Sequence, residues 1–126
     1  MGYGTDGLTF STLRYASRNR VTHTEKFKHC RKWTPAQWLQ ALIGEIGEAA
    51  NVLKKVDRGD MTMDDAREAL AKEFADVQTY LDLLADKCGV DLGRATIDKF
   101  NEVSVRVGSD IRINDAGDDW HYNRDA

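Results

Sequence analysis

The chain has 126 residues, of which 41% are hydrophobic and 31% are charged, and its formal net charge is −3. This length and balance fit one compact domain over residues 1–126 and leave too little chain for two. No stretch approaches the roughly 20 apolar residues of a membrane helix, and the polar start lacks the order of a signal peptide. We therefore expect a cytoplasmic protein.

Cysteine and histidine are placed wrongly for a disulfide framework or a structural zinc site. Cys30 and Cys88 have no CxxC neighbours, and the histidines lie at no zinc-finger spacing, so we expect two buried free thiols. One proline and few alternating β-branched runs favour helices with short connections. The predicted fold class is all-α, an antiparallel helix bundle.

The first predicted helix runs from Leu8 to about Arg20 and belongs to a basic segment that precedes an acidic middle and tail. Against the single acid Glu25, this segment carries Arg14, Arg18, Arg20, Lys26, Lys28, Arg31 and Lys32. A basic arm can approach nucleic acid, but a basic helix face is more often simply solvated, so we do not expect a nucleic-acid partner.

The second and third helices are predicted from their caps. In Thr34-Pro35-Ala36-Gln37, a Thr cap, a Pro at the first helical position and a Gln that closes a capping box start a helix that runs to about Val56. Gly59 supplies the stop. The sequence Thr62-Met63-Asp64-Asp65 opens the next helix, which ends near Cys88-Gly89.

The last predicted helix is capped by Asp91 and ends before Gly108. Residues 1–7 and 109–126 are predicted to be flexible or arm-like, because they are polar and contain glycine.

Apolar residues at helical spacing define one face on each of the two central helices. The predicted core residues are Leu39, Leu42, Ile46, Ala49 and Leu53, and then Leu70, Phe74, Val77, Leu81 and Leu84. Ile43, Val52 and Leu83 fall outside these faces, and we expect a second subunit to cover them. Glu73 lies at the margin of its face, where a carboxylate requires a basic partner or a metal ion.

Two pairs of acids, Glu45/Glu48 and Glu73/Asp76, are spaced i, i+3 on the central helices. Such pairs are common on solvated helices, but antiparallel packing would bring these two together, and four clustered carboxylates repel unless cations neutralise them. All-oxygen ligands select Mg²⁺, with Mn²⁺ as a substitute. A di-iron site needs Glu-x-x-His motifs, and no His occurs between Trp33 and Trp120.

The acid motifs stand in a longer pattern. It contains Leu42-Ile43-Gly44-Glu45-Ile46-Gly47-Glu48-Ala49-Ala50 and Lys72-Glu73-Phe74-Ala75-Asp76-Val77, and then Tyr80, Asp86-Lys87-Cys88-Gly89-Val90-Asp91-Leu92 and Lys99-Phe100. Over about residues 34–108 this pattern resembles the ExxE and ExxD motifs of the MazG-like, all-α nucleoside triphosphate pyrophosphohydrolases.

The resemblance implies Mg²⁺-dependent cleavage of a nucleoside triphosphate (NTP or dNTP) to the monophosphate and pyrophosphate. It implies that Glu45, Glu48, Glu73 and Asp76 bind metal, that Lys99 contacts phosphate, and that the chain forms a homodimer or homotetramer. Relatives often carry an Asn four positions after the Lys, where this chain has Val103. Asn101 points away from Lys99 on the helical wheel, so Arg106 is the better second phosphate contact.

Two further residues complete the predicted site, and one of the four acids has a second role. Tyr80, one turn beyond Asp76, and Trp38, near the helix cap, are placed at the substrate, although a Tyr at this position more often serves packing and packing is at least as good a role for Trp38. Glu48 is our choice of general base, because the less buried acid of a pair exchanges a proton more freely.

The sequence leaves two alternatives open. Within the same superfamily, an all-α dUTP or dCTP pyrophosphatase or a phosphoribosyl-ATP pyrophosphohydrolase would share the acid cluster and differ in base recognition. From another class, the chain would be a non-enzymatic helical interaction module whose basic arm binds nucleic acid or a protein.

Overall fold

The computed structural model describes residues 7–114 and the backbone of residues 120–122. Its contacts group into two compact units, Met1–Cys88 and Gly89–Ala126. The described residues form five helices and two short strands joined by short connections, which confirms the predicted all-α class. None of the described helices is long and apolar enough to cross a membrane. The single domain predicted above stays a prediction.

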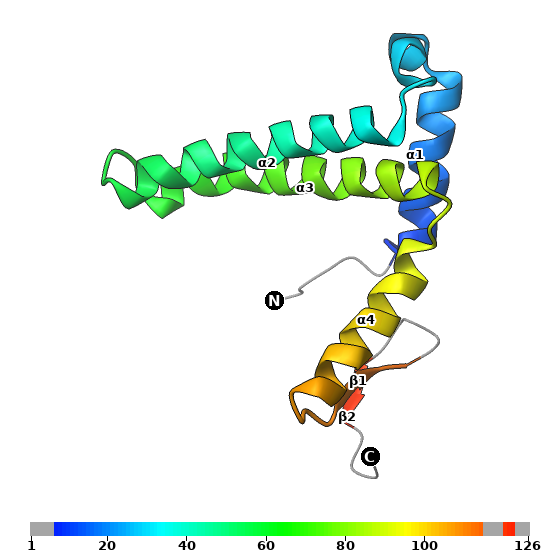
Figure 1. The fold of residues 1–126 in the computed structure, drawn as a ribbon. Coiled ribbons are helices and arrows are strands. Elements are labelled where there is room, and N and C mark those ends of the chain that lie inside the picture. Colours follow the sequence, from blue (N-terminus) through cyan, green and yellow to red (C-terminus); the bar gives the residue numbers. More distant parts are fainter. Residues whose placement is uncertain (1–6, 115–119, 123–126) are drawn as a thin grey trace. The chain divides into compact units, whose positions relative to one another are not determined.

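The first unit is built on a helical hairpin of α2 (Pro35–Asp57) and α3 (Met63–Lys87), which lie side by side in Figure 1. Thr34 caps α2 as predicted: its Oγ1 accepts from the Gln37 N–H at 3.2 Å, and its own N–H donates to Gln37 Oε1 at 2.8 Å. Gly59 occupies the turn with φ +83°, a conformation that side chains with a Cβ rarely adopt. Thr62 caps α3 by accepting from the Asp65 N–H. Both predicted starts are correct because caps are local features.

An N-terminal helix, α1 (Phe10–His23), crosses the open end of this hairpin and leads into a short 3₁₀ helix, η1 (Glu25–Cys30). Ion pairs attach α1 to α3. Arg14 Nε lies 3.0 Å from Asp82 Oδ1, and Arg18 Nη2 lies 2.6 Å from Asp86 Oδ1. Two arginines of the predicted basic arm are therefore structural.

The contact between α2 and α3 follows a 3-4 spacing of residues that are all at least half-buried, as in a coiled coil. On α2 these are Trp38, Leu42, Glu45, Ala49, Val52 and Val56, and on α3 they are Ala66, Leu70, Glu73, Val77, Tyr80 and Leu84. We call these positions the hairpin seam. One buried cluster at its open end contains Cys30, Trp38 and Leu83, and a second near the turn contains Ala49, Ala66 and Leu70.

Several predicted core residues lie outside the seam, and their assignment was wrong. Leu39, Ile46, Leu53 and Phe74 are 39–53% exposed, whereas Leu83, which was expected to need a second subunit, is only 8% exposed. The apolar arc of α2 is wider than the strip that one neighbouring helix covers, so its flank stays uncovered. Cys88 is also exposed, because it lies at the C-cap of α3, whereas Cys30 is buried as expected.

The second unit contains α4 (Leu92–Arg106), β1 (Ile111–Ile113) and β2 (Trp120–Tyr122), with the two strands antiparallel. The Asn101 amide holds β1 on α4: its Nδ2 donates to the Ile113 carbonyl, and its Oδ1 accepts from the Ile113 N–H, both at 2.9 Å. Residues 109–114, predicted as part of an arm, thus form a turn and a strand. Residues 1–6, 115–119 and 123–126, in the same prediction, lie outside the described residues.

Candidate functional site

Two acids interrupt the apolar seam of the hairpin. Glu45 and Glu73 take seam positions between the two buried clusters, and both are half-buried. The helical repeat that brings Leu42 and Ala49 against α3 also turns Glu45 toward it. The interior of the hairpin therefore changes from apolar to acidic for about one helical turn.

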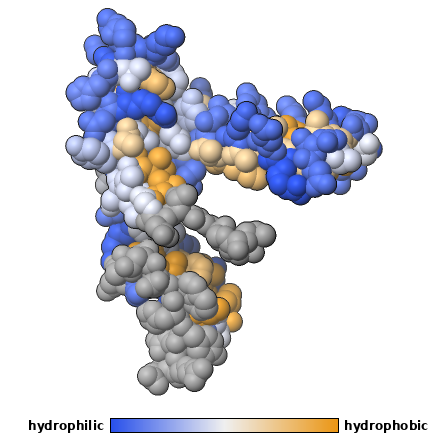
Figure 2. Space-filling view, turned by 180° about the vertical axis from the view of Figure 1, so that it is seen from behind, coloured by the Kyte–Doolittle hydropathy of each residue, from blue (hydrophilic) through white to orange (hydrophobic). Residues whose placement is uncertain are grey.

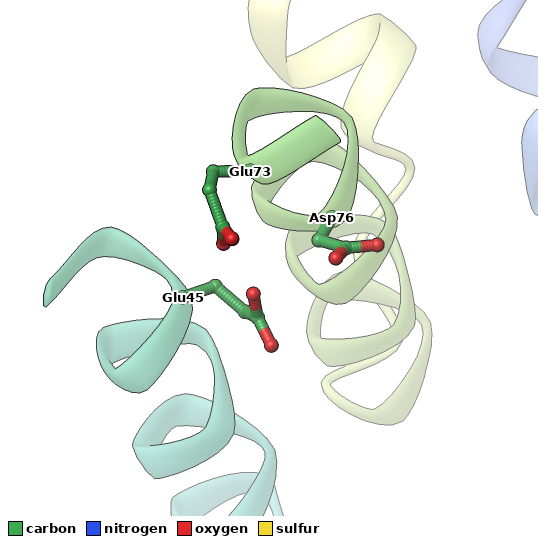
Figure 3. Close-up of side chains that lie close together, drawn as sticks. All are labelled: Glu45, Glu73 and Asp76. Carbon is green, nitrogen blue, oxygen red and sulfur yellow. The ribbon is translucent and has the colours of Figure 1, made fainter. Parts of the chain in front are cut away.

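Asp76 completes a compact group with these two acids. One carboxylate oxygen from each of Glu45, Glu73 and Asp76 lies within 4.8 Å of the others. In Figure 3, Glu45 reaches from α2 toward the two acids of α3. Glu48 is more exposed and stands outside this group of three, but its carboxylate is within hydrogen-bonding reach of Glu73.

The electrostatics of this acid cluster show mutual repulsion. A hydrogen bond with Glu45, then burial and the charges of Glu45 and Asp76, raise the pKa of Glu73 above its ordinary value. The charge of Glu73, followed by a hydrogen bond with it, raises the pKa of Glu48. Carboxylates this close to one another repel, and a proton or a cation between them would relieve that repulsion.

One oxygen of Glu73 suits a cation. Its Oε2 is buried and has no hydrogen-bond partner among the described residues, as is also true of Asp82 Oδ2 beside Arg14. Such an oxygen is destabilising unless a proton, a hydrogen-bond donor or a cation satisfies it. The donors are all oxygen, which fits Mg²⁺ or Mn²⁺, and the residues present therefore suit the expected metal.

Tyr80 connects the acid cluster to the aromatic residues of the open end. Its ring lies 6.1 Å from that of Trp38, and its pKa is raised by burial and then by the charges of Glu45 and Asp76. The Tyr80 hydroxyl thus lies in the field of the acids, and its predicted substrate contact stays a prediction.

Trp38 is part of the buried core at the open end. It is 2% exposed and packs edge-on against Trp33 at 4.8 Å. Its indole Nε1 has no hydrogen-bond partner in the described part of the chain. A packing role is evident, and the predicted substrate contact stays a prediction.

Lys99 and Arg106 belong to the second unit, so their predicted phosphate contacts stay predictions. Lys99 Nζ pairs with Glu102 at 3.2 Å and borders a groove of about 620 Å³ along α4, whose lining residues do not include Arg106. Asn101, which stands near the Asn position of the family pattern, uses its amide to hold Ile113.

One basic residue near Phe27 and Tyr80 was not assigned to the site from the sequence. The guanidinium carbon of Arg20, on α1, lies 5.4 Å from the centre of the Phe27 ring. The positive charge of Arg20 lowers the pKa of the Tyr80 hydroxyl. The sequence showed it only as one cation in a basic segment, because nothing local says which of these cations face the hairpin.

No family model matches the chain. Its sequence is similar to dCTP pyrophosphatase 1 from Rattus norvegicus, Mus musculus and Homo sapiens, with 39%, 38% and 37% identity over 90 residues. Each alignment covers 65% of this chain and 52% of the relative, so the chain spans about half the length of the curated relatives it matches.

Proposed function

We propose that this protein is a metal-dependent nucleoside triphosphate pyrophosphohydrolase that releases pyrophosphate and leaves the monophosphate. The observation that supports this most is the group of Glu45, Glu73 and Asp76 inside the hairpin seam. The similarity to proteins named dCTP pyrophosphatase 1 favours a nucleoside triphosphate as substrate and makes dCTP the first nucleotide to try.

Glu45, Glu48, Glu73 and Asp76 would hold Mg²⁺, or Mn²⁺ in its place. When bound, the metal neutralises charge on the acids and on the triphosphate and lowers the pKa of a coordinated water. Glu48, which like Asp76 is exposed, is proposed to accept the proton of the attacking water. The half-buried Glu45 and Glu73 keep the cluster in place from two helices.

Four further residues are proposed to serve substrate binding. Tyr80 stands next to the acids, and its hydroxyl can donate to a phosphate or sugar oxygen, while Trp38 supports the Tyr80 ring from behind. Lys99 and Arg106 are proposed to contact phosphate. Their positive charge would offset the negative charge of a triphosphate, which the acids alone would repel.

We also propose a homodimer or homotetramer, because one copy of the chain leaves much of the hairpin uncovered. Figure 2 shows apolar surface along it. The exposed residues on this flank are Leu39, Ile43, Ile46, Leu53 and Phe74. A patch of large apolar side chains at helical spacing is typical of a helix-packing interface.

Light scattering at micromolar concentration tests the oligomer. We expect a mass of two or four chains, and a shift toward the monomer for Ile43→Lys, because Ile43 is the most exposed of these residues at 56%. A wild-type protein that keeps the monomer mass as its concentration rises contradicts this proposal.

The non-enzymatic interaction module is less well supported. Arg14 and Arg18 are engaged with Asp82 and Asp86, which removes two cations from a nucleic-acid surface. A binding module also gives no reason for Glu73 to occupy an apolar seam. The choice among dCTP, dUTP and phosphoribosyl-ATP rests on base recognition, and a cytoplasmic location remains an expectation.

The decisive experiment measures pyrophosphate and phosphate release over a panel of NTPs and dNTPs with Mg²⁺, with Mn²⁺ and with excess chelator. We expect pyrophosphate from at least one nucleotide and none in chelator. Release of inorganic phosphate alone, or equal activity in chelator, contradicts the proposed reaction.

A further inference from the structure

The three arginines on the hairpin-facing helix α1 have different partners. Arg14 and Arg18 pair with Asp82 and Asp86 of α3. Arg20 pairs with no acid within residues 7–114, and its guanidinium lies over the Phe27 ring instead. An arginine stacked on a ring is oriented while its in-plane N–H donors stay available.

The position of Arg20 relates it to the acid cluster. Phe27, under the guanidinium, and Tyr80 pack against the same buried cluster of Cys30, Trp38 and Leu83. The negative charges of Glu45 and Asp76 raise the pKa of the Tyr80 hydroxyl, and the positive charge of Arg20 lowers it. Arg20 of α1 and the acids of α2 and α3 therefore act electrostatically on the same hydroxyl.

The chemistry of a metal-bound triphosphate requires cations beyond the metal site. The acids hold the substrate only through the metal, and phosphate oxygens that do not bind metal keep their charge. A guanidinium matches pairs of phosphate oxygens with parallel N–H donors. On α1, only Arg20 offers these donors near Tyr80, because Arg14 and Arg18 are bound to α3.

We propose that Arg20 is a further substrate-binding residue that contacts the triphosphate beside Tyr80. This inference rests on the proposed pyrophosphohydrolase function and adds to it a contact from the N-terminal helix. The stacked Phe27 ring is the positioning residue that keeps the Arg20 side chain extended over the aromatic cluster.

The test compares Arg20→Gln, Arg20→Lys and the matched control Lys26→Gln, which removes one exposed cation from the neighbouring η1. Calorimetric titration with magnesium tripolyphosphate, a probe without a base, measures the contact directly. We expect Arg20→Gln to weaken binding about tenfold or more, as one lost charge-assisted hydrogen-bonding group implies. Arg20→Lys should recover part of this loss, and Lys26→Gln should stay within about twofold of wild type, since it loses only a screened surface charge.

Kinetics give the second readout. Arg20→Gln should raise KM for the preferred nucleotide more than it lowers kcat, and it should leave the affinity for Mg²⁺ alone unchanged. Equal effects of Arg20→Gln and Lys26→Gln on tripolyphosphate binding would overturn the Arg20 contact while the proposed function stands. A wild-type protein that neither binds magnesium tripolyphosphate nor releases pyrophosphate would overturn both.

Discussion

Helix α3 carries two pairs of acids that have opposite surroundings. Glu73 and Asp76 meet the acids of α2, whereas Asp82 and Asp86, two to three turns later, meet the arginines of α1. The pKa of Glu73 is raised by its acidic neighbours, and that of Asp86 is lowered by its hydrogen bond and charge pairing with Arg18. The same residue types on one helix therefore form ion pairs in one place and the proposed metal site in the other.

Structural acids and ligand-binding acids should respond differently to mutation. When a structural acid is mutated, its ion pair is broken and the free energy of unfolding falls. When a metal-binding acid is mutated in the metal-free protein, its repulsion with the neighbouring acids is removed, so that metal binding is lost but stability is not.

Replacement of Glu73 by Gln should abolish metal binding and reduce pyrophosphate release by at least about a hundredfold, since even indirect partners of a metal are worth 10–100-fold. The metal-free fold should be unchanged or more stable, because one repelling, half-buried charge is gone. Mg²⁺ titration and thermal unfolding in chelator measure the two effects.

Glu68→Gln is the matched control for this variant. Glu68 is an exposed acid on the same helix and pairs with Lys72 at 3.7 Å. It should retain metal binding and activity. A large loss of metal-free stability in Glu73→Gln would instead identify Glu73 as the partner of a basic residue.

A loss of stability is expected where α3 forms ion pairs with α1. Asp82 is 1% exposed and bonded to Arg14, so Asp82→Asn should lower the free energy of unfolding by about 3 kcal/mol, the usual effect of breaking a buried ion pair. Urea unfolding measures this loss. If Asp82→Asn and Glu73→Gln shift stability in the same direction, the distinction between the two acid pairs fails.

The helix starts and the anomalous acid were predictable from the sequence. Thr34, Thr62 and Asp91 cap their helices as expected, because capping needs only residues three positions apart. Glu73 stood out because its helical spacing placed it beside apolar residues. The convergence of the acid pairs followed from one short turn between two helices of similar length.

Features that depend on distant partners were not predictable. The hairpin seam is offset from the predicted arcs, because sequence shows how much of a helix is apolar but not how wide a strip its neighbour covers. The strand at Ile113 depends on the Asn101 amide, twelve residues away. Arg20 could not be distinguished from Arg14 and Arg18, since their different partners arise only when α1 crosses α3.

The smallest predicted effect is a pH dependence at Asp86. Because the folded-state pKa of Asp86 lies below its unfolded value, its ion pair with Arg18 stabilises the fold fully above the unfolded pKa. This contribution is lost as the pH falls through the lower, folded-state value. Asp86→Asn should therefore be less stable than wild type at neutral pH, by less than Asp82→Asn because the Arg18 side chain is 58% exposed and the pair is screened.

The difference in unfolding free energy between wild type and Asp86→Asn should shrink as the pH is lowered below the ordinary aspartate range, and it should also shrink at about 1 M salt. Urea unfolding at a series of pH values measures it, with Asp98→Asn as the control, because Asp98 forms an exposed i, i+4 pair with Arg94 on α4. A difference that stays constant down to strongly acid pH would show that Asp86 acts through packing and not through its charge, and the joint between α1 and α3 would then rest on Asp82 alone.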